Sequence, residues 1–264
     1  MRYLFTALEL AFYTLIFQSD LPVVVADPLS MRSKKGVERL QAKFYEEQQK
    51  AKLLRVEGDT ITLDTSLALC LTPVFEGEVG VLHLDTEWAR QTNYNICYYI
   101  SEKHGVTALR NVTSKYRVQR YELQHYPDIT VCQNDFLKDF NFEEFVEFTG
   151  KPLKICVSIG EMEKVLESYD YKEKIFQVVL DFAQAHQVEA DEISDLFHLF
   201  SKDKAVSIEV GRRETIKLGG IIATVLLEKQ YMTRFIASPD GDLATIESFS
   251  KNTLLQQLIN FEGR

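Results

Sequence analysis

The hydrophobic pattern of this chain changes period several times, and this feature restricts its fold more than any other. Residues 34–54 place Val37, Leu40 and Phe44 at helical spacing among lysine, glutamate and glutamine, which predicts an amphipathic helix. From Leu54 the period becomes two, the spacing of a strand with one buried face. Strand-like and helix-like segments are grouped rather than strictly alternating, so we expect an α+β fold rather than a doubly wound parallel sheet.

The N-terminal half predicts an antiparallel strand meander. Residues 54–63 predict a hairpin, with its turn at Glu57-Gly58-Asp59, because two period-two runs flank a glycine. The further strands expected in this half are residues 66–75, 79–88, 95–101 and 115–123. Residues 135–148 are expected to be a short helical or irregular acidic segment.

The C-terminal half predicts helices together with a second antiparallel strand group. Residues 152–159 read as a buried strand, and two amphipathic helices are expected at 172–186 and 191–200. The later strands are expected at 205–210, 215–227 and 231–238, with turns at 211–213 and 239–242, and a closing helix at 248–261. No internal repeat is visible in the sequence.

Residues 1–30 allow three interpretations. The apolar run from Leu4 to Phe17 carries Glu9 in its middle, which fits a helix packed on the protein's own core. A dispensable leader before Met31 is the second interpretation. An export or anchoring signal cleaved after Ala26 is the third. We therefore expect a leader or packed helix at 1–30, an α+β half with the meander at 31–150 and a second α+β half, closed by a helix, at 151–264.

Composition bounds the class of protein. The chain has 264 residues, of which 45% are hydrophobic, and only 12 are Gly and 6 are Pro, so we expect an ordered protein with a substantial core. The net charge of -9 repels phosphate backbones and anionic lipid at long range. Nucleic-acid and membrane partners are therefore disfavoured.

The four cysteines predict buried, free thiols. Cys70, Cys97, Cys132 and Cys156 each have apolar neighbours and are far apart in the sequence. A zinc site needs a close pair such as C-x2-C. We expect no metal knuckle and no cofactor.

One short motif supports an enzyme as the alternative. Nucleotide-binding, dinucleotide-binding and hydrolase motifs are absent from the sequence. Asp85-Thr86-Glu87 at the end of a predicted strand resembles the first motif of the DEDD-type 3′-5′ exonucleases. This resemblance implies two divalent metal ions held by carboxylates, with a histidine near the attacking water. The residues implied are Asp85, Glu87, Asp139 and Asp191 as metal ligands and His186 as the catalytic residue. Period-two alternation explains the same strand without any site.

A basic and aromatic stretch supplies the candidates for partner binding. Residues 103–121 contain basic residues and no Asp or Glu, a composition that suits docking on an acidic protein surface or stacking on nucleic acid. The acidic surface is expected at 135–147 of the same chain or of a second copy, so a homo-oligomer is included. The candidate residues are Arg110, Lys115, Arg117, Arg120, Tyr116 and Tyr121.

These observations favour a non-enzymatic, acidic binding or adaptor protein that acts through a protein–protein surface in the cytoplasm. The first alternative is the metal-dependent exonuclease. The second is an exported or membrane-anchored protein that uses residues 1–26 as its signal.

Overall fold

The structure is a computed structural model of this chain. It describes residues 1–85, 93–112, 119–140, 153–171, 175–191, 206–212, 223–228, 231–236 and 243–260. The chain divides into two compact units: unit 1 contains Met1–Asn134 and Gly211–Gly220, and unit 2 contains Asp135–Val210 and Ile221–Arg264. The domain boundary predicted after residue 150 lies outside the described residues. Helices and antiparallel sheets together confirm the predicted α+β class.

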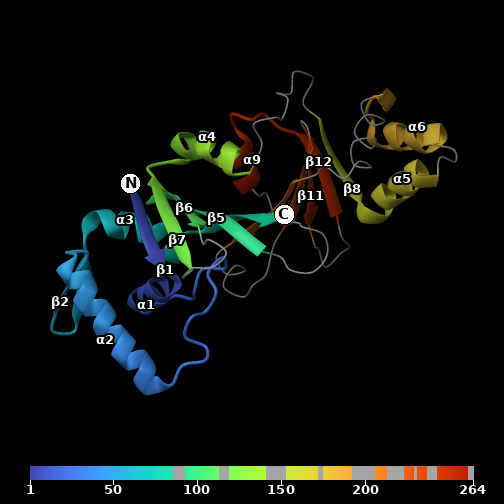
Figure 1. The fold of residues 1–264 in the computed structure, drawn as a ribbon. Helices are drawn as coiled ribbons and strands as arrows, with labels where there is room; N and C mark the ends of the chain where they lie inside the picture. The colour runs from blue at the N-terminus through green and yellow to red at the C-terminus, as the bar shows by residue number, and fades with distance from the viewer. Residues whose placement is uncertain are drawn as a thin grey trace. The chain divides into compact units, whose positions relative to one another are not determined.

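Unit 1 contains an antiparallel sheet whose strands follow the order β1-β7-β6-β5-β4 (Figure 1). These strands are β1 (Arg2–Thr6), β4 (Val79–Asp85), β5 (Asn93–Ser101), β6 (Gly105–Asn111) and β7 (Arg120–Tyr126). The strands β4 to β7 form a meander, as predicted for this half. Strand β6 was not predicted. Its turn from β5 requires Gly105, whose φ is +78° and where a Cβ would meet the backbone oxygens of Tyr126 and Pro127.

The segment between β1 and β4 contains helices and a separate hairpin. Helices α1 (Ala7–Phe17) and α2 (Lys34–Lys50) precede the hairpin of β2 (Leu54–Glu57) and β3 (Thr60–Leu63), and α3 (Thr65–Glu76) follows it. Helix α2 confirms the amphipathic helix predicted at 34–54, and β2 with β3 confirms the hairpin predicted at 54–63. The hairpin is a two-stranded sheet of its own.

Helix α3 corrects the strand predicted at 66–75. Asp64 caps the helix by accepting hydrogen bonds from the backbone N–H groups of Ser66 and Leu67. The buried residues Leu67, Cys70, Leu71 and Val74 have the spacing of one helical face. A short apolar run fits both a strand and a buried helix, and here the cap and the spacing favour the helix.

Helix α1 lies inside the core of unit 1. Thr6 accepts a hydrogen bond from the Glu9 backbone N–H, and the Glu9 carboxylate accepts from the Thr6 N–H and hydroxyl, which is a capping box. This explains a glutamate within an apolar run. The side chains of Leu10, Phe12 and Tyr13 are 0% exposed. In the structure, residues 1–30 thus include a strand of the sheet and a helix of the core.

Unit 2 contains five antiparallel strands in the order β9-β10-β11-β12-β8. Its strands are β8 (Lys154–Ser158), β9 (Val206–Arg212), β10 (Ala223–Glu228), β11 (Tyr231–Ile236) and β12 (Leu243–Ser248). Strand β9 continues through Arg212, so the predicted turn at 211–213 does not begin at 211. Strand β12 was not predicted. The predicted turn at 239–242 lies outside the described residues.

The helices of unit 2 include α5 (Ile159–Tyr171), α6 (Ile175–His186) and α9 (Leu254–Ile259). Helix α6 confirms the helix predicted at 172–186, whereas α5 was not predicted. Helix α9 is shorter than the predicted closing helix, because Ser248 belongs to β12. Of the helix predicted at 191–200, only Asp191 is described. Helix α4 (Ile129–Asp139) crosses the division between the units.

The two units repeat one topology. In each, a first strand is followed by helices and then by four antiparallel strands, and the last of these four pairs with the first strand. A helix follows the last strand in both cases: α4 follows β7, and α9 follows β12. The sequence shows no repeat, because topology depends on where apolar positions fall and not on which residues fill them.

Candidate functional site

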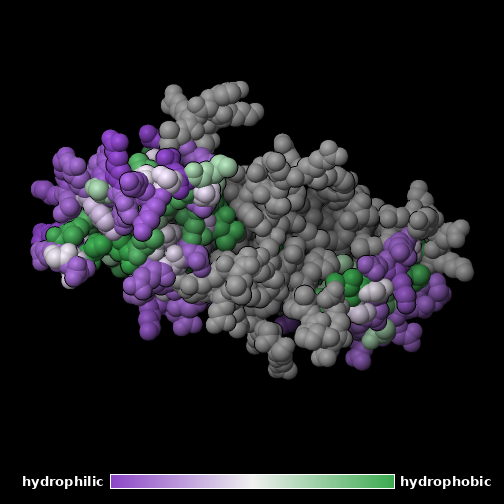
Figure 2. Space-filling model, turned by 90° about the horizontal axis from the view of Figure 1, so that it is seen from below, coloured by the Kyte–Doolittle hydropathy of each residue, from purple (hydrophilic) through white to green (hydrophobic). Residues whose placement is uncertain are grey.

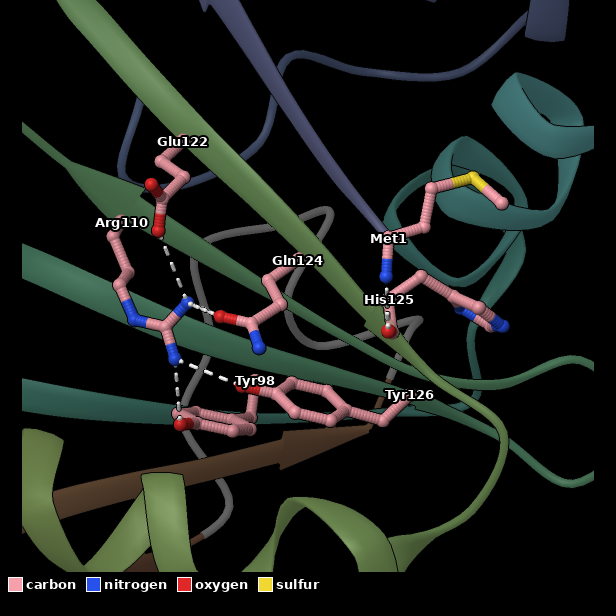
Figure 3. A network of polar contacts seen from close by, with 7 residues as sticks. All are labelled: Met1, Tyr98, Arg110, Glu122, Gln124, His125 and Tyr126. Carbon is pink, nitrogen blue, oxygen red and sulfur yellow. Dashed lines mark hydrogen bonds and ion pairs between the residues drawn. The ribbon is translucent and has the colours of Figure 1, made fainter.

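Arg110 is the centre of a polar cluster on the sheet of unit 1 (Figure 3). Its guanidinium donates hydrogen bonds to Gln124 Oε1 at 3.0 Å, to the Tyr98 hydroxyl at 3.1 Å and to the Tyr126 hydroxyl at 3.2 Å. It also lies 3.6 Å from the Glu122 carboxylate, and its side chain is 14% exposed. The guanidinium is therefore held by neighbouring strands, and its charge is paired within the sheet.

Two of the other predicted binding residues, Tyr121 and Arg120, lie in the described part of β7. Tyr121 is 1% exposed and belongs to the core, and its hydroxyl accepts a hydrogen bond from the Ala26 N–H at 3.4 Å. The prediction of Tyr121 as a surface residue is wrong, because its position on β7 faces the core helices. Arg120 is exposed at the start of β7. Lys115, Tyr116 and Arg117 lie outside the described residues.

A second contact in the same view involves the N-terminus. The Met1 amine lies 3.5 Å from the His125 carbonyl oxygen (Figure 3), and the His125 Nδ1 lies 3.4 Å from the Thr107 hydroxyl. Burial, and then the positive Met1 amine and His104, lower the pKa of His125. The contact between Met1 and His125 holds β1 against β7. The lowered pKa favours the neutral imidazole of His125.

The residues of the nuclease alternative are only partly described. Asp85 is the last residue of β4, without a described side chain, and Glu87 lies outside the described residues. Asp139 ends α4, His186 ends α6 and Asp191 is exposed. In the part of the chain that the structure describes, no three His, Cys, Asp or Glu side chains could hold a metal ion together. The convergence of Asp85 and Glu87 with the others, which the nuclease alternative requires, involves side chains outside the described ones.

The described contacts of His186 are with residues of α5 and α6. Its Nε2 lies 3.9 Å from the Glu161 carboxylate, and its ring centroid lies 4.4 Å from that of Phe182. Glu161 is the acceptor of a capping box with Ser158 at the start of α5. The histidine therefore contacts the capped start of α5 from the end of α6.

The cysteines differ in exposure. All four are free; Cys70, Cys97 and Cys132 are buried and Cys156 is exposed. Burial raises the pKa of Cys70 to about 12. The prediction of four buried thiols is wrong for Cys156, because β8 turns Ile155 and Val157 inward and alternates Cys156 outward.

Helix α6 presents an apolar surface that no described residue covers. Phe176 is 82% exposed, and Leu180, one helical turn further, is 51% exposed. We call these two side chains the α6 patch. The adjoining face of the helix is buried through Val179, Phe182 and Ala183. One face of the helix therefore packs in the core of unit 2, and Phe176 and Leu180 form a second, exposed apolar edge.

Exposed acidic side chains outnumber basic ones among the described residues of α5 and α6. Asp181 lies on α6 and accepts a hydrogen bond from Gln177 Nε2 at 2.6 Å. The exposed carboxylates among the described side chains of α5 and the residues after α6 include Glu161, Glu163, Glu167, Glu189 and Asp191, and Lys164 on α5 is also exposed. Figure 2 shows apolar groups beside hydrophilic ones on the described surface of unit 2.

The sequence contains no signal that distinguishes the α6 patch from the buried positions of the same helix. Residues 172–186 were predicted as an amphipathic helix, and Phe176, Val179, Leu180 and Ala183 have the i, i+3, i+4, i+7 spacing of one apolar face. The exposure of Phe176 and Leu180 is therefore visible only in the structure. The acidic stretch around them was interpreted as a solvated helical face.

No helix in the described ranges has both the length and the apolar character to cross a membrane. Comparison with known protein families finds no match, and no curated protein matches either. Among solved structures, the chain is similar to the type VII secretion system chaperone EspG5 of Mycobacterium tuberculosis, in complex with a PE25-PPE41 dimer. The identity is 7%, the match covers 98% of this chain and 94% of that chain, and the TM-score is 0.48. At this level the similarity supports no conclusion about partners.

Proposed function

We propose that this chain is a non-enzymatic binding protein, and that the α6 patch is part of the surface on which a protein partner docks. The observation that carries the proposal is the 82% exposure of Phe176, with Leu180 beside it on the same helix. Burying a phenylalanine or leucine side chain stabilises a protein by about 1.5–3 kcal/mol. Two such side chains left outside the core supply this free energy to a partner instead.

Aromatic side chains support this role more strongly than scattered aliphatic ones. Isolated exposed apolar residues are ordinary on protein surfaces, and Leu4, Leu15 and Leu69 on unit 1 are of this kind. Binding hot spots are enriched in aromatic anchors that are surrounded by a polar rim. Phe176 supplies such an aromatic side chain, on a helix pair whose described exposed charged side chains are mostly acidic. Four free cysteines fit a reducing compartment, so we place this role in the cytoplasm.

Site-specific photo-crosslinking tests the proposal. p-Benzoylphenylalanine is placed at position 176 of the full chain, and at position 15 as a control, because Leu15 on α1 is 50% exposed. In lysate of cells that produce this protein, we expect a discrete protein adduct from position 176 that Leu180→Asp removes. The absence of an adduct at 176, or the same adducts from both positions, contradicts the proposal.

A further inference from the structure

We propose that residues 30–35 are a processing site for an endoprotease that cleaves after basic residues, and that the bond it hydrolyses is Arg32–Ser33. The segment connects α1 and α2 of unit 1. All its residues are exposed, and the Met31 side chain is 99% exposed. Exposed connecting segments are the preferred sites of proteolytic cleavage in folded proteins.

The backbone of this segment is held by local hydrogen bonds. The Arg32 N–H donates to the Leu29 carbonyl oxygen at 2.9 Å, and the Arg32 Nε donates to the Pro28 carbonyl oxygen at 3.0 Å. Each hydrogen bond that residues 30–35 make in the described part of the chain joins groups no more than four positions apart. Opening the segment therefore breaks no hydrogen bond to a distant part of unit 1.

The first turn of α2 is weak for reasons of charge and composition. Lys34 and Lys35 occupy this turn, where the positive end of the helix dipole disfavours cations. Gly36 follows them, and glycine favours a helix less than any residue except proline. Ser33 caps the turn by accepting a hydrogen bond from the Gly36 N–H at 3.3 Å. This turn opens at a low cost, so residues on both sides of the Arg32–Ser33 bond can enter an active site in an extended conformation.

The side chains of the segment define the class of protease. A protease with a carboxylate at the base of its S1 pocket accepts an arginine or lysine side chain, and Arg32 supplies one. Water adds a hydroxyl group to the Arg32 carbonyl carbon and a hydrogen to the Ser33 nitrogen as the C–N bond between them breaks, so no other reactant is needed. The bonds after Lys34 and Lys35 lie in helical backbone, which is why Arg32–Ser33 is the bond assigned.

Both sides of the cleaved bond remain attached to unit 1. Before the bond, β1 pairs with β7, and the α1 side chains Leu10 and Phe12 are 0% exposed. After the bond, Phe44 holds α2 in the same core and is 4% exposed. Burial of these apolar side chains keeps residues 1–32 in place. The product is therefore a two-chain protein and not a protein that has lost its first strand and helix.

Limited digestion of the full chain with trypsin tests the proposal. Mass spectrometry of singly cut chains measures the initial rate at each bond. We expect Arg32–Ser33 to be cleaved at least about 10-fold faster than the bond after Arg55, because cleavage follows the population of the open form. Arg55 is the matched control: it lies in another run of exposed residues, 55–60, but β2 pairs it with Thr62 of β3.

Two substitutions show whether cleavage depends on the assigned residue. Arg32→Gln is expected to lower cleavage anywhere within residues 30–35 about 10-fold or more, whereas Arg55→Gln leaves it unchanged. Size-exclusion chromatography under native conditions is expected to elute the fragment 1–32 together with the rest of the cut chain. In protein purified from cells that produce it, intact-mass analysis is expected to find the same two fragments, and Arg32→Gln is expected to remove them.

Equal cleavage after Arg32 and Arg55 overturns the proposal, since exposure alone then decides where the chain is cut. Cleavage within residues 30–35 that Arg32→Gln leaves unchanged overturns the assignment of the bond. Release of the fragment 1–32 from the cut chain contradicts the two-chain product. Protein from its own cells with the Arg32–Ser33 bond intact overturns a processing role.

Discussion

The first helix of unit 1 and that of unit 2 begin in the same way but bury different amounts of their surface. In unit 1, β1 leads through Thr6 and Glu9 into α1, whose side chains Leu10, Phe12 and Tyr13 are 0% exposed. In unit 2, β8 leads through Ser158 and Glu161 into α5. Helix α5 buries a narrow stripe of residues that includes Met162 and Val165, and exposes its charged face.

The helices that follow also differ in how much of their surface they bury, and again the helix of unit 1 is the more buried one. In unit 1, α3 packs against strands β5, β6 and β7, and the Thr107 hydroxyl donates to the Cys70 carbonyl oxygen between α3 and β6. In unit 2, α6 packs mainly on α5 and leaves Phe176 exposed. One topology thus supports a closed core around α1 and α3 in unit 1, and in unit 2 an amphipathic helix that leaves Phe176 exposed.

Removing residues 1–30 has the largest expected effect on this comparison. A chain that begins at Met31 loses β1, which pairs with β7, and the buried side chains of α1. Several buried side chains at about 1.5–3 kcal/mol each exceed the stability of an ordinary domain. We expect unit 1 to lose amide protection while the described strands of unit 2 keep theirs, as measured by hydrogen exchange. Native protection of β7 in this variant would contradict the assignment of α1 to the core.

Two phenylalanine substitutions compare the closed core with the open surface directly. Phe12→Ala leaves a cavity in the core of unit 1 and is expected to lower the free energy of unfolding by about 3–5 kcal/mol. Phe176→Ala removes an exposed ring and is expected to change it by no more than about 0.5 kcal/mol. Urea denaturation measures both. Similar losses from both substitutions would mean that Phe176 belongs to a core.

A buried polar contact between α1 and α2 is expected to have an intermediate effect. The Tyr13 hydroxyl donates to Gln48 Oε1 at 2.9 Å, and Gln48 Nε2 donates to Glu9 Oε1 at 3.2 Å. Burial, and then the Glu9 charge, raise the pKa of Tyr13. Gln48→Ala leaves the tyrosine hydroxyl unsatisfied and is expected to cost about 1–3 kcal/mol. The double variant with Tyr13→Phe should recover part of this loss, and no recovery would show that the two side chains are not coupled.

The two capping boxes allow a test at matched positions. Thr6→Ala and Ser158→Ala each remove a cap and are expected to cost about 1 kcal/mol. The hydrogen bonds from the Ser158 hydroxyl and then its N–H lower the pKa of Glu161 below its ordinary value of 4.5. Because the folded carboxyl binds protons less readily than the unfolded one, its stabilising contribution is present above the ordinary pKa. It is lost as the pH falls through the lowered value.

Acid titration of stability checks this sign. The free energy of unfolding of Glu161→Gln should fall less steeply below about pH 4.5 than that of the unmodified chain. An identical pH dependence would show that the second capping box does not form in solution.

Substitution of a cysteine has the smallest expected effect on stability. Thiol reactivity distinguishes the buried cysteines of unit 1 from the exposed Cys156 of unit 2. Cys70 and Cys97 lie in the core of unit 1, and Cys156 lies on the outer face of β8. We expect one of the four thiols to react with a disulfide reagent in the native protein, and all four to react after unfolding without reductant. Cys156→Ser should abolish the native reaction. Native reaction of more than one thiol, or fewer than four free thiols after unfolding, would contradict the structure.

The sequence by itself determined several local elements of this protein. Period-two and helical spacing predicted the α+β class, the helix at 34–54, the hairpin at 54–63 and the helix at 172–186. Each follows from neighbours within a few residues, because the side-chain period is a property of the local backbone. The exposure of Phe176 was not predictable in this way, because Phe176, Val179, Leu180 and Ala183 have the spacing of a single apolar face.

Tertiary structure alone decided which of these elements are buried and against what. The apolar run at 66–75 fits a strand as well as a helix by local pattern, and the face of Leu67, Cys70, Leu71 and Val74 is buried only through the packing of α3 on the sheet. Tyr121 faces the core, and Arg110 contacts Glu122 and Gln124, because β7 pairs with β6 and with β1 in this register. The repeated topology of the two units has the same origin, since contacts between residues far apart in the chain leave no local period that a sequence could display.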